Sequence, residues 1–309
     1  MTREPRLMLL DTASLYFRAF FGVPPVEGPD GTPVNAVRGL LDFISRLVDT
    51  YSPTHLVCCW DDDWRPQWRV DLVPTYKAHR VVEEVAAGAD VEEVPDPLQV
   101  QVPIIRDVLA AFGIAVIGAP EAEADDVIGT LATEAGMPVD VVTGDRDLFQ
   151  LVDDSLGVRV LYTARGVGNH DRVDEEWVRA KYDVTAAQYA DFATMRGDTS
   201  DGLPGVKGVG EKTAAKLLAE HGTLDAVRAA AADDAVTMAA GVRAKVLAAS
   251  DYLDVAPTVV AVRRDLALDR SLGALPGAPA DPAALEELTE RFGLSSPVER
   301  LTGVLAAQG

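Results

Sequence analysis

Acidic side chains follow several apolar runs of the sequence, at points where strands or helices should end. They lie in the local sequences LLD, CWD, EAEADD, TGDRD and GDTSD, which are far apart along the chain. Without a counter-charge such carboxylates repel one another and resist burial. Hard divalent cations such as Mg²⁺ take oxygen ligands. The pattern therefore predicts a metal site built from nine acids: Asp11, Asp61, Glu123, Asp125, Asp126, Asp145, Asp147, Asp198 and Asp201.

Each of these acids also has an ordinary explanation when it is taken alone. An Asp at a strand end often forms a turn or caps the next helix. Acids near a helix start favour the helix dipole, which would explain Glu123, Asp125 and Asp126. The joint pattern favours metal, because Glu123 and Asp126 share a helix face at i,i+3 spacing. Two metal ions roughly 4 Å apart can activate water and stabilise a leaving oxygen in phosphodiester hydrolysis.

A second motif, GVKGVGEKTAAKLL, extends from Gly205 to Leu218. Its central glycines permit a tight turn and a close approach of backbone to phosphate, and the next helix offers free N–H groups. Three of the six lysines of the chain lie here. The alternative is an ordinary glycine turn with solvated lysines, but the full spacing favours phosphate binding. The residues concerned are Lys207, Gly208, Gly210, Lys212, Thr213 and Lys216.

A third motif, YKAHR, lies in a long connection between a strand and a helix. Lys77 and Arg80 are one helical turn apart and are predicted to reach one phosphate. Tyr76 or a nearby Trp is predicted to stack on an unpaired base. A solvated basic helix face is the alternative. The following residues, Val81 to Pro97, carry only acidic charges.

Strand and helix patterns alternate in the first part of the chain, which predicts a mainly parallel sheet with helices on both faces. Ligands of such sheets bind beyond the carboxyl ends of the strands. Strands are expected at Leu7–Asp11, His55–Asp61, Ile114–Ile117, Val139–Thr143 and Val158–Tyr162. Helices are expected at Asn35–Thr50, Leu98–Phe112, Ala122–Ala135 and Asp145–Leu151.

The pattern becomes helical from about Asp174, so we divide the chain into a core at 1–173, a helical region at 174–265 and a tail at 266–309. Helices are expected at Glu175–Tyr182, Thr185–Arg196, Lys212–Glu220, Leu224–Ala231 and Val242–Leu253, with a further strand at Val259–Val262. The segment Ser271–Pro282 is expected to be a linker before small helices at Ala283–Phe292 and Pro297–Leu305.

The net charge is −21, from 28 Lys and Arg against 49 Asp and Glu, and by itself argues against nucleic-acid binding. The clustering of the scarce lysines argues for it. We find no apolar span long enough for a bilayer and no signal peptide, so a cytoplasmic protein is expected. The adjacent Cys58 and Cys59 should point to opposite sheet faces as buried thiols.

Together these motifs resemble the bacterial 5′–3′ exonuclease and flap endonuclease family, which includes the 5′-nuclease domain of DNA polymerase I. The resemblance covers almost the whole chain and keeps the order LLDTASLYFRAF, WRVDLVPTYKAHR, EAEADDVIGTLA, VVTGDRDLFQL and MRGDTSDGLPGVKGVGEKTAAKLL. It implies a PIN-like α/β core, a helical arch at about 62–97 and a helix-hairpin-helix element that grips duplex DNA. No polymerase domain follows, so a stand-alone nuclease is expected.

The resemblance also implies roles for residues. All nine acids would occupy metal-site positions for two or more Mg²⁺ or Mn²⁺ ions. Lys77 and Arg80 would be catalytic contacts of the scissile phosphate, and Ser200 a ligand of K⁺ at the hairpin. We expect further DNA contacts from Arg18, Arg69 and Tyr76. The expected partner is branched or nicked duplex DNA with a 5′ single-stranded flap or an RNA-primed end, bound by a monomer in the nucleoid.

Several positions depart from the family pattern. Thr12 stands where the family commonly has Gly, Gly202 stands where it has Asn, and Asp61–Asp63 replace a single acid. We assign Asp61 to the metal by its place at the strand end. The acidic run after Arg80, with Glu83, Glu84, Glu92 and Glu93, either weakens threading of a flap or lies outside its path.

Two rival functions belong to other classes. A non-catalytic DNA junction binder would be expected to lack some of the nine acids, yet all are present. A metal-dependent phosphatase of small molecules would suit the acids, but would leave the hairpin and the basic segment without a task.

Overall fold

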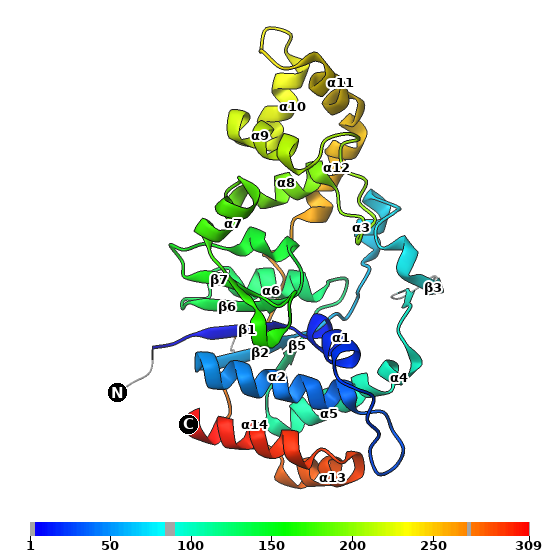
Figure 1. Ribbon diagram of the computed structural model, residues 1–309, viewed down its shortest axis with the longest axis vertical. Coiled ribbons are helices and arrows are strands. Elements are labelled where there is room, and N and C mark those ends of the chain that lie inside the picture. The colour runs from blue at the N-terminus through cyan, green and yellow to red at the C-terminus, as the bar shows by residue number, and fades with distance from the viewer. Residues whose placement is uncertain (1–3, 84–89, 271–272, 309) are drawn as a thin grey trace.

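A six-stranded sheet forms the centre of the molecule in the computed structural model, which describes residues 4–83, 90–270 and 273–308 (Figure 1). The strand order is β5-β2-β1-β6-β7-β8. All neighbours pair in parallel except β7 and β8, which are antiparallel. The predicted α/β class is thus confirmed. The strands are β1 (Leu7–Asp11), β2 (His55–Cys59), β5 (Ala115–Ile117), β6 (Val139–Thr143), β7 (Val158–Tyr162) and β8 (Asp171–Val173).

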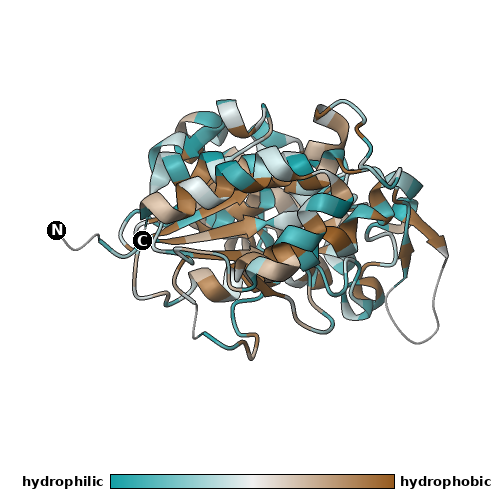
Figure 2. Ribbon diagram, turned by 90° about the horizontal axis from the view of Figure 1, so that it is seen from below, coloured by the Kyte–Doolittle hydropathy of each residue, from teal (hydrophilic) through white to brown (hydrophobic). Residues whose placement is uncertain are grey.

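Apolar residues alternate between the two faces of the sheet, and each face has its own core. Leu7 and Leu9 belong to one hydrophobic cluster, whereas Met8 and Leu10 belong to the other. Cys58 and Cys59 divide in the same way as free buried thiols, as predicted. Seen from below, the brown of apolar segments lies inside a largely teal shell (Figure 2).

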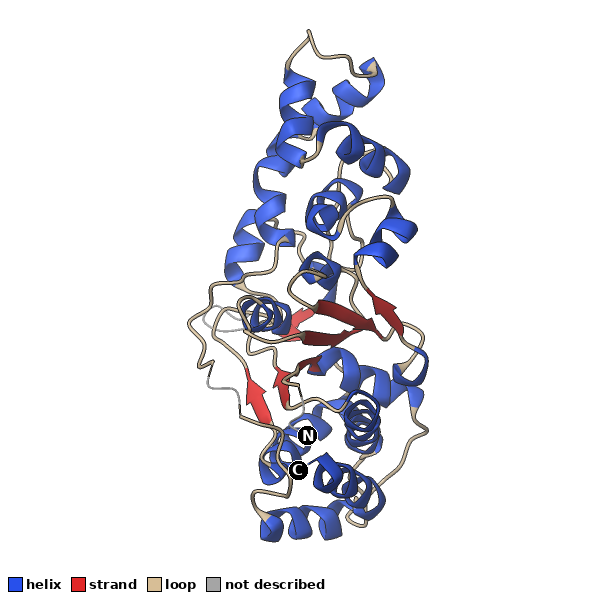
Figure 3. Ribbon diagram, turned by 90° about the vertical axis from the view of Figure 1, so that its left-hand side faces the viewer, coloured by secondary structure: helices blue, strands red, loops and turns tan. Residues whose placement is uncertain are grey.

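Helices cover both faces. The helices α2 (Asn35–Tyr51), α5 (Gln101–Phe112), α13 (Pro282–Phe292) and α14 (Ser295–Gln308) pack on the face of Met8, and α6 (Ala124–Ala132) packs on the other. Strong amphipathicity explains α2, most of whose apolar residues are buried. Figure 3 shows the strands enclosed between helical layers above and below.

Residues 175–260 form a helical region at one end of the molecule (Figure 1). It contains α7 (Glu175–Tyr182), α8 (Tyr189–Arg196), α9 (Glu211–His221), α10 (Leu224–Ala232), α11 (Ala240–Ala248) and α12 (Ser250–Val260). Phe149 of the core packs edge-on against Trp177 and Tyr189, with ring centroids 5.5 and 5.3 Å apart. This aromatic packing makes one continuous core from the sheet and the helical region. In the described part of the chain, no helix has the length and hydropathy needed to cross a membrane.

Three local predictions were wrong. The predicted strand Val259–Val262 is instead the end of α12 followed by irregular chain, because its valines are buried by helix packing. The predicted helix Val242–Leu253 is interrupted at Ala249, which separates α11 from α12. The predicted helix Asp145–Leu151 is a short 3₁₀ helix, η2 (Asp147–Leu151). The sequence analysis also missed α1 (Thr12–Gly22) and β8.

The expected helical arch is only partly helical in its described residues. It contains α3 (Gln67–Leu72), the 3₁₀ helix η1 (Ala78–Arg80), the hairpin strands β3 (Val81–Glu83) and β4 (Val91–Glu92), and α4 (Asp96–Gln99). Prolines at 66, 74 and 95 limit helix length here. Residues 84–89, with Glu84, lie outside the described residues.

After α12 the chain crosses α6 in close contact. The Arg263 N–H donates to Asp126, and Thr130 donates to the Arg263 carbonyl at 3.4 Å. A Cβ at Gly129 would lie 2.5 Å from that carbonyl oxygen. Only glycine therefore fits at this crossing.

We expect Gly129→Ala to lower the free energy of unfolding by about 1–3 kcal/mol, because the added methyl overpacks the crossing. Gly303→Ala is the matched control, since Gly303 lies within α14 with open space around it. It should stabilise by about 1 kcal/mol through helix propensity. Urea denaturation of both variants measures this. Equal stability of the two variants would contradict the claim that only glycine fits where the chain crosses α6.

Candidate metal centre and nucleic-acid interface

A large cavity of about 1160 Å³ opens at the carboxyl ends of the parallel strands. Six of the nine predicted metal-binding acids line it: Asp11, Asp61, Glu123, Asp125, Asp145 and Asp198. Lys77, Arg80 and Arg18 line it as well. The fold thus brings together residues that are far apart in sequence.

The ends of β1 and β2 position two of these acids. Asp11 ends β1 and caps α1, because its Oδ1 accepts from the Ser14 N–H at 3.2 Å. Its Oδ2 accepts from the Thr143 hydroxyl at 2.7 Å. Asp61 lies just beyond β2 and accepts from the Ala124 N–H at 2.8 Å. Of the run Asp61–Asp63, only Asp61 lines the cavity, as its place at the strand end predicts.

The predicted repulsion among these carboxylates is present in their pKa values. Burial is the main cause that raises the pKa of Asp11 to about 7, and the neighbouring negative charge of Asp61 is the second cause. Burial raises the pKa of Asp61 to about 6. Burial and then Asp11 raise the pKa of Asp125 well above its usual range, and its carboxylate accepts no hydrogen bond from the described residues. A cation among these oxygens would relieve the repulsion.

Two further acids lie beside the cavity. Asp147 begins η2. Burial is the main cause that raises its pKa, and the neighbouring negative charge of Asp145 is the second cause. Its Oδ1 is buried with no hydrogen-bond partner in the described residues, which suits an oxygen that would bind a metal ion or its water. Asp201 accepts from Arg80 at 3.2 Å. As they stand, the described side chains do not form a group of three or more that would hold one ion. Mg²⁺ commonly keeps several waters, so few carboxylates need contact it directly.

Asp198 accepts hydrogen bonds from two arginines and from Ser200. It accepts from Arg196 at 3.1 Å and from Arg146 at 3.3 Å, and from both the N–H and the hydroxyl of Ser200. Burial opposes these contacts, yet the hydrogen bonds from Ser200 and the two arginines lower the pKa of Asp198. The contacts of Ser200 therefore belong to the acidic cavity and not to the hairpin. They give its predicted role as a K⁺ ligand no support.

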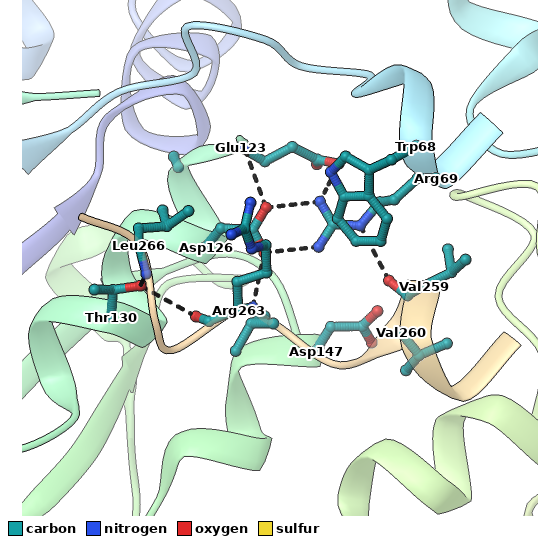
Figure 4. A network of polar contacts seen from close by, with 12 residues as sticks. Trp68, Arg69, Glu123, Asp126, Thr130, Asp147, Val259, Val260, Arg263 and Leu266 are labelled. Carbon is teal, nitrogen blue, oxygen red and sulfur yellow. Dashed lines mark hydrogen bonds and ion pairs between the residues drawn. The ribbon is translucent and has the colours of Figure 1, made fainter. Parts of the chain in front are cut away.

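A buried arginine holds Glu123 and Asp126 (Figure 4). Arg69 donates to both oxygens of Asp126 at 2.8 and 2.7 Å and to Glu123 at 3.0 Å. Its Nε donates to the Val259 carbonyl at 3.1 Å, which ties α3 to the end of α12. The predicted DNA contact of Arg69 is wrong, because its side chain is 3% exposed. Asp126 is fully buried in a structural role, and its predicted role as a ligand has no support in these contacts.

Glu123 is also the partner of the two neighbouring motif residues. The Tyr76 hydroxyl donates to it at 2.6 Å, and the Lys77 ammonium forms an ion pair with it. Tyr76 is buried, so its predicted stacking on a base is wrong for this structure. Arg80 donates to the Ser200 carbonyl at 2.7 Å. Both Lys77 and Arg80 line the cavity, and their contact with phosphate stays a prediction.

The loop Asp198–Leu203 docks on the chain before Lys77. Thr75 donates to the Gly202 carbonyl at 2.7 Å, and the Lys77 N–H donates to the Asp201 carbonyl at 2.9 Å. Gly202 has a φ of +70°, and a Cβ there would lie 2.0 Å from the Thr75 carbonyl oxygen. The Asn that the family has at this place would not fit, which gives this departure a physical reason.

The predicted phosphate-binding hairpin lies between α8 and α9. Gly208 has a φ of +80°, and Gly210 caps α9 without a side-chain hydrogen bond, so the N–H groups of Glu211 and Lys212 remain available. Lys207, Lys212 and Lys216 are exposed, and Thr213 is half-buried. The sequence analysis missed Lys245, whose ammonium donates to the Gly208 carbonyl at 2.9 Å. No local signal marks it, because it comes from α11.

Other cavity residues were missed or only partly understood. Arg18 donates to the Ala164 carbonyl at 3.3 Å, while its Nε is buried without a partner among the described residues. Arg146 and Arg165 also line the cavity, and Arg146 stands within the TGDRD motif that was read only for its acids. The cavity thus joins negative and positive groups at one place.

Residues 6–183 match the family model described as the 5′–3′ exonuclease N-terminal resolvase-like domain, and residues 184–283 match the 5′–3′ exonuclease C-terminal SAM fold. The chain belongs to the 5′–3′ exonuclease family. A 5′–3′ exonuclease of Streptomyces coelicolor is 60% identical over 97% of this chain and 100% of its own length. A 5′–3′ exonuclease of Mycobacterium tuberculosis is 53% identical over 98% of each chain. The expected family is thereby confirmed.

Solved structures share the fold of this family member. The T5 D15 protein co-crystallised with metal ions superposes with a TM-score of 0.65 at 16% identity, covering 98% of this chain and 100% of its own. The catalytic core of Rad2 in complex with DNA substrate gives 0.62 at 18%, covering 99% and 93%. At such identities the likeness concerns the fold.

We expect the metal-free protein to lose stability as the pH rises. The folded state binds protons at Asp11 and Asp61 more tightly than the unfolded chain does, because burial raises both pKa values. The free energy of unfolding should therefore fall between about pH 4 and pH 7. Thermal melts in EDTA measure this. Asp11→Asn should flatten the dependence, whereas Asp251→Asn, at an exposed site, should not. A pH-independent melting temperature would contradict the assignment.

Removal of Arg69 should be far more harmful than removal of an exposed arginine. Arg69→Met removes the bidentate partner of buried Asp126 and leaves Glu123 paired with Lys77, which costs about 3–5 kcal/mol. Arg300→Met is the control, since Arg300 pairs with Asp42 on the surface, where such pairs contribute about 0–1 kcal/mol. Chemical denaturation compares the two variants. If Arg69→Met lowers the free energy of unfolding as little as Arg300→Met does, Arg69 does not stabilise the protein through Asp126 and Glu123.

Proposed function

We propose that this protein is a structure-specific 5′ nuclease that hydrolyses phosphodiester bonds of DNA where duplex meets a 5′ single strand. The observation that carries the proposal is the cavity itself. Buried carboxylates with raised pKa values converge there beside Lys77 and Arg80. Such a site suits two Mg²⁺ or Mn²⁺ ions and a phosphate.

The residues divide into metal-holding and phosphate-holding groups. Asp11, Asp61, Asp125 and Asp145 would hold the ions, with Glu123, Asp147, Asp198 and Asp201 beside them. The ions, when bound, would supply activated water and neutralise the leaving oxygen. Lys77 and Arg80 would place positive charge beside the phosphoryl oxygens. To do so they exchange their present partners, Glu123 and the Ser200 carbonyl, for the substrate.

DNA binding belongs to the hairpin and the cavity rim. Exposed Lys207 and Lys212 flank the free N-terminus of α9, which suits a backbone phosphate of the duplex. Arg18, with its unpartnered Nε, would hold another phosphate inside the cavity. The T5 and Rad2 structures carry metal ions and DNA respectively, which supports the same assignment here. The hairpin would also bind K⁺, through groups other than Ser200.

The proposed role is the removal of flaps or RNA-primed 5′ ends in replication and repair. A cytoplasmic monomer acting at the nucleoid fits this role. The negative net charge does not oppose it, because four of the six lysines lie in the lining of the cavity and in the hairpin motif.

The test is cleavage of a 5′-labelled flap duplex with Mg²⁺, Mn²⁺ or EDTA, resolved at single nucleotides. Asp125→Asn and Asp145→Asn should each lower kcat by about 100-fold or more, because they remove ion-holding oxygens, while DNA binding by gel shift persists. Glu287→Gln on exposed α13 is the control and should cleave normally. DNA binding without any cleavage by the native protein would favour a junction-binding protein. Hydrolysis of a chromogenic phosphomonoester alone would favour a phosphatase.

A further inference from the structure

A second cavity of about 880 Å³ continues from the metal-site cavity past β4. The two share four lining residues: Phe17, Phe21, Glu92 and Glu93. A nucleic-acid strand held at Arg80 has two ways to continue. One leads toward the hairpin and α9, and the other leads into this second cavity, whose lining includes Asp96 and Gln99 of α4. The helix α4 lies away from α9–α11 (Figure 1).

Acidic residues line both cavities, but in the described residues basic side chains line only the first. The first cavity has Lys77, Arg80, Arg18, Arg146 and Arg165 in its lining. The second has none of these, and its lining, drawn from the described residues, contains no Lys or Arg. Its charged residues are Glu92, Glu93 and Asp96, which we call the acidic edge. The sequence from Val81 to Pro97 contains no basic residue at all.

Fixed contacts hold the acidic edge in place. Trp64 donates to the Asp90 carbonyl at 2.7 Å, and Arg65 forms an ion pair with the Asp90 side chain. The Glu93 N–H donates to the Arg80 carbonyl at 2.8 Å. The strand β4 is thus fastened on both sides of Glu92, directly beside Arg80, which is one of the basic residues in the lining of the first cavity.

The neighbouring surface offers little that would compensate the acidic edge. The second cavity is otherwise lined mainly by apolar side chains, among which Phe21 and Val82 are 72% and 66% exposed. A strand of nucleic acid carries one negative charge per nucleotide. Arg80 and Lys77 partly offset Glu92, where the two cavities meet. Each phosphate that goes further into the second cavity meets Glu93 and Asp96 in a lining that has no basic side chain among the described residues.

We propose that the acidic edge, Glu92, Glu93 and Asp96, determines substrate specificity by disfavouring 5′ strands with long unpaired segments. The preferred substrate is a nick or a very short flap, whose 5′ end stops within the first cavity. The inference rests on the proposed function, since it concerns the path of the same strand. It assigns these residues no contact with the reacting atoms.

The experiment measures kcat/KM for a nicked duplex and for a long-flap duplex with the same junction, in Mg²⁺. The native protein should prefer the nick. The isosteric E92Q/E93Q variant should raise the flap-to-nick ratio on the order of tenfold, because it removes two repulsive charges. The gain should lie mainly in KM for the flap. Charge reversal in E92K/E93K should raise the ratio further.

Charge-matched E286Q/E287Q is the control, because it removes the same two charges from exposed positions of α13. Its ratio should equal that of the native protein. Added KCl should raise the flap-to-nick ratio of the native protein, since salt screens the repulsion, and should have less effect on E92Q/E93Q. If a double variant melts early, Asp96→Asn provides a second measurement, with a smaller rise expected.

An unchanged ratio in E92Q/E93Q and in E92K/E93K would overturn the inference. A native preference for the long flap over the nick would overturn it as well. Failure of the proposed function looks different, because neither substrate would then be cleaved by the native protein in any metal.

Discussion

Negative charge at the carboxyl edge of the sheet constrains the rest of this structure. The strand ends bring Asp11, Asp61 and Asp145 together, and the start of α6 adds Glu123 and Asp125. Burial raises the pKa of Asp11 and Asp61 and so makes their ionisation costly. The surrounding chain is arranged to offset this charge.

Three basic side chains supply that compensation from the segment that the sequence analysis assigned to an arch. Arg69 neutralises Asp126 and part of Glu123 inside the protein, Lys77 pairs with the rest of Glu123, and Arg80 reaches Asp201. The same contacts fasten this segment to α6, to the end of α12 and to the loop after α8. The ion pairs that neutralise the acids therefore also hold this segment against the rest of the protein. A substrate phosphate would compete for two of the three cations, while Arg69 stays in place because it is buried on all sides.

The overall acidity of the protein is compatible with DNA because charge is segregated. Four of the six lysines lie in the lining of the cavity and in the hairpin motif, whereas the segment Val81–Pro97 carries only acidic charges. Electrostatic attraction to a polyanion depends on these local fields over about a Debye length, roughly 10 Å at moderate salt. A sum of charges over the whole chain has little bearing on it.

The sequence by itself determined the family, the α/β class, the strands β1, β6 and β7, and the convergence of six acids, because strand-end spacing and motif order are local properties. It also separated Asp61 from its two acidic neighbours. It did not reveal that Arg69 and Tyr76 are buried braces of Glu123, that Lys245 reaches Gly208, or that Gly202 must be glycine. Those facts depend on partners that are distant in sequence. Arg69 contacts Val259, Lys245 contacts the hairpin, and Gly202 lies against Thr75. An arginine in a basic motif looks the same in sequence whether it meets a phosphate or a buried carboxylate. Only the tertiary structure decides which partner it has, because burial and distance fix the electrostatic energy.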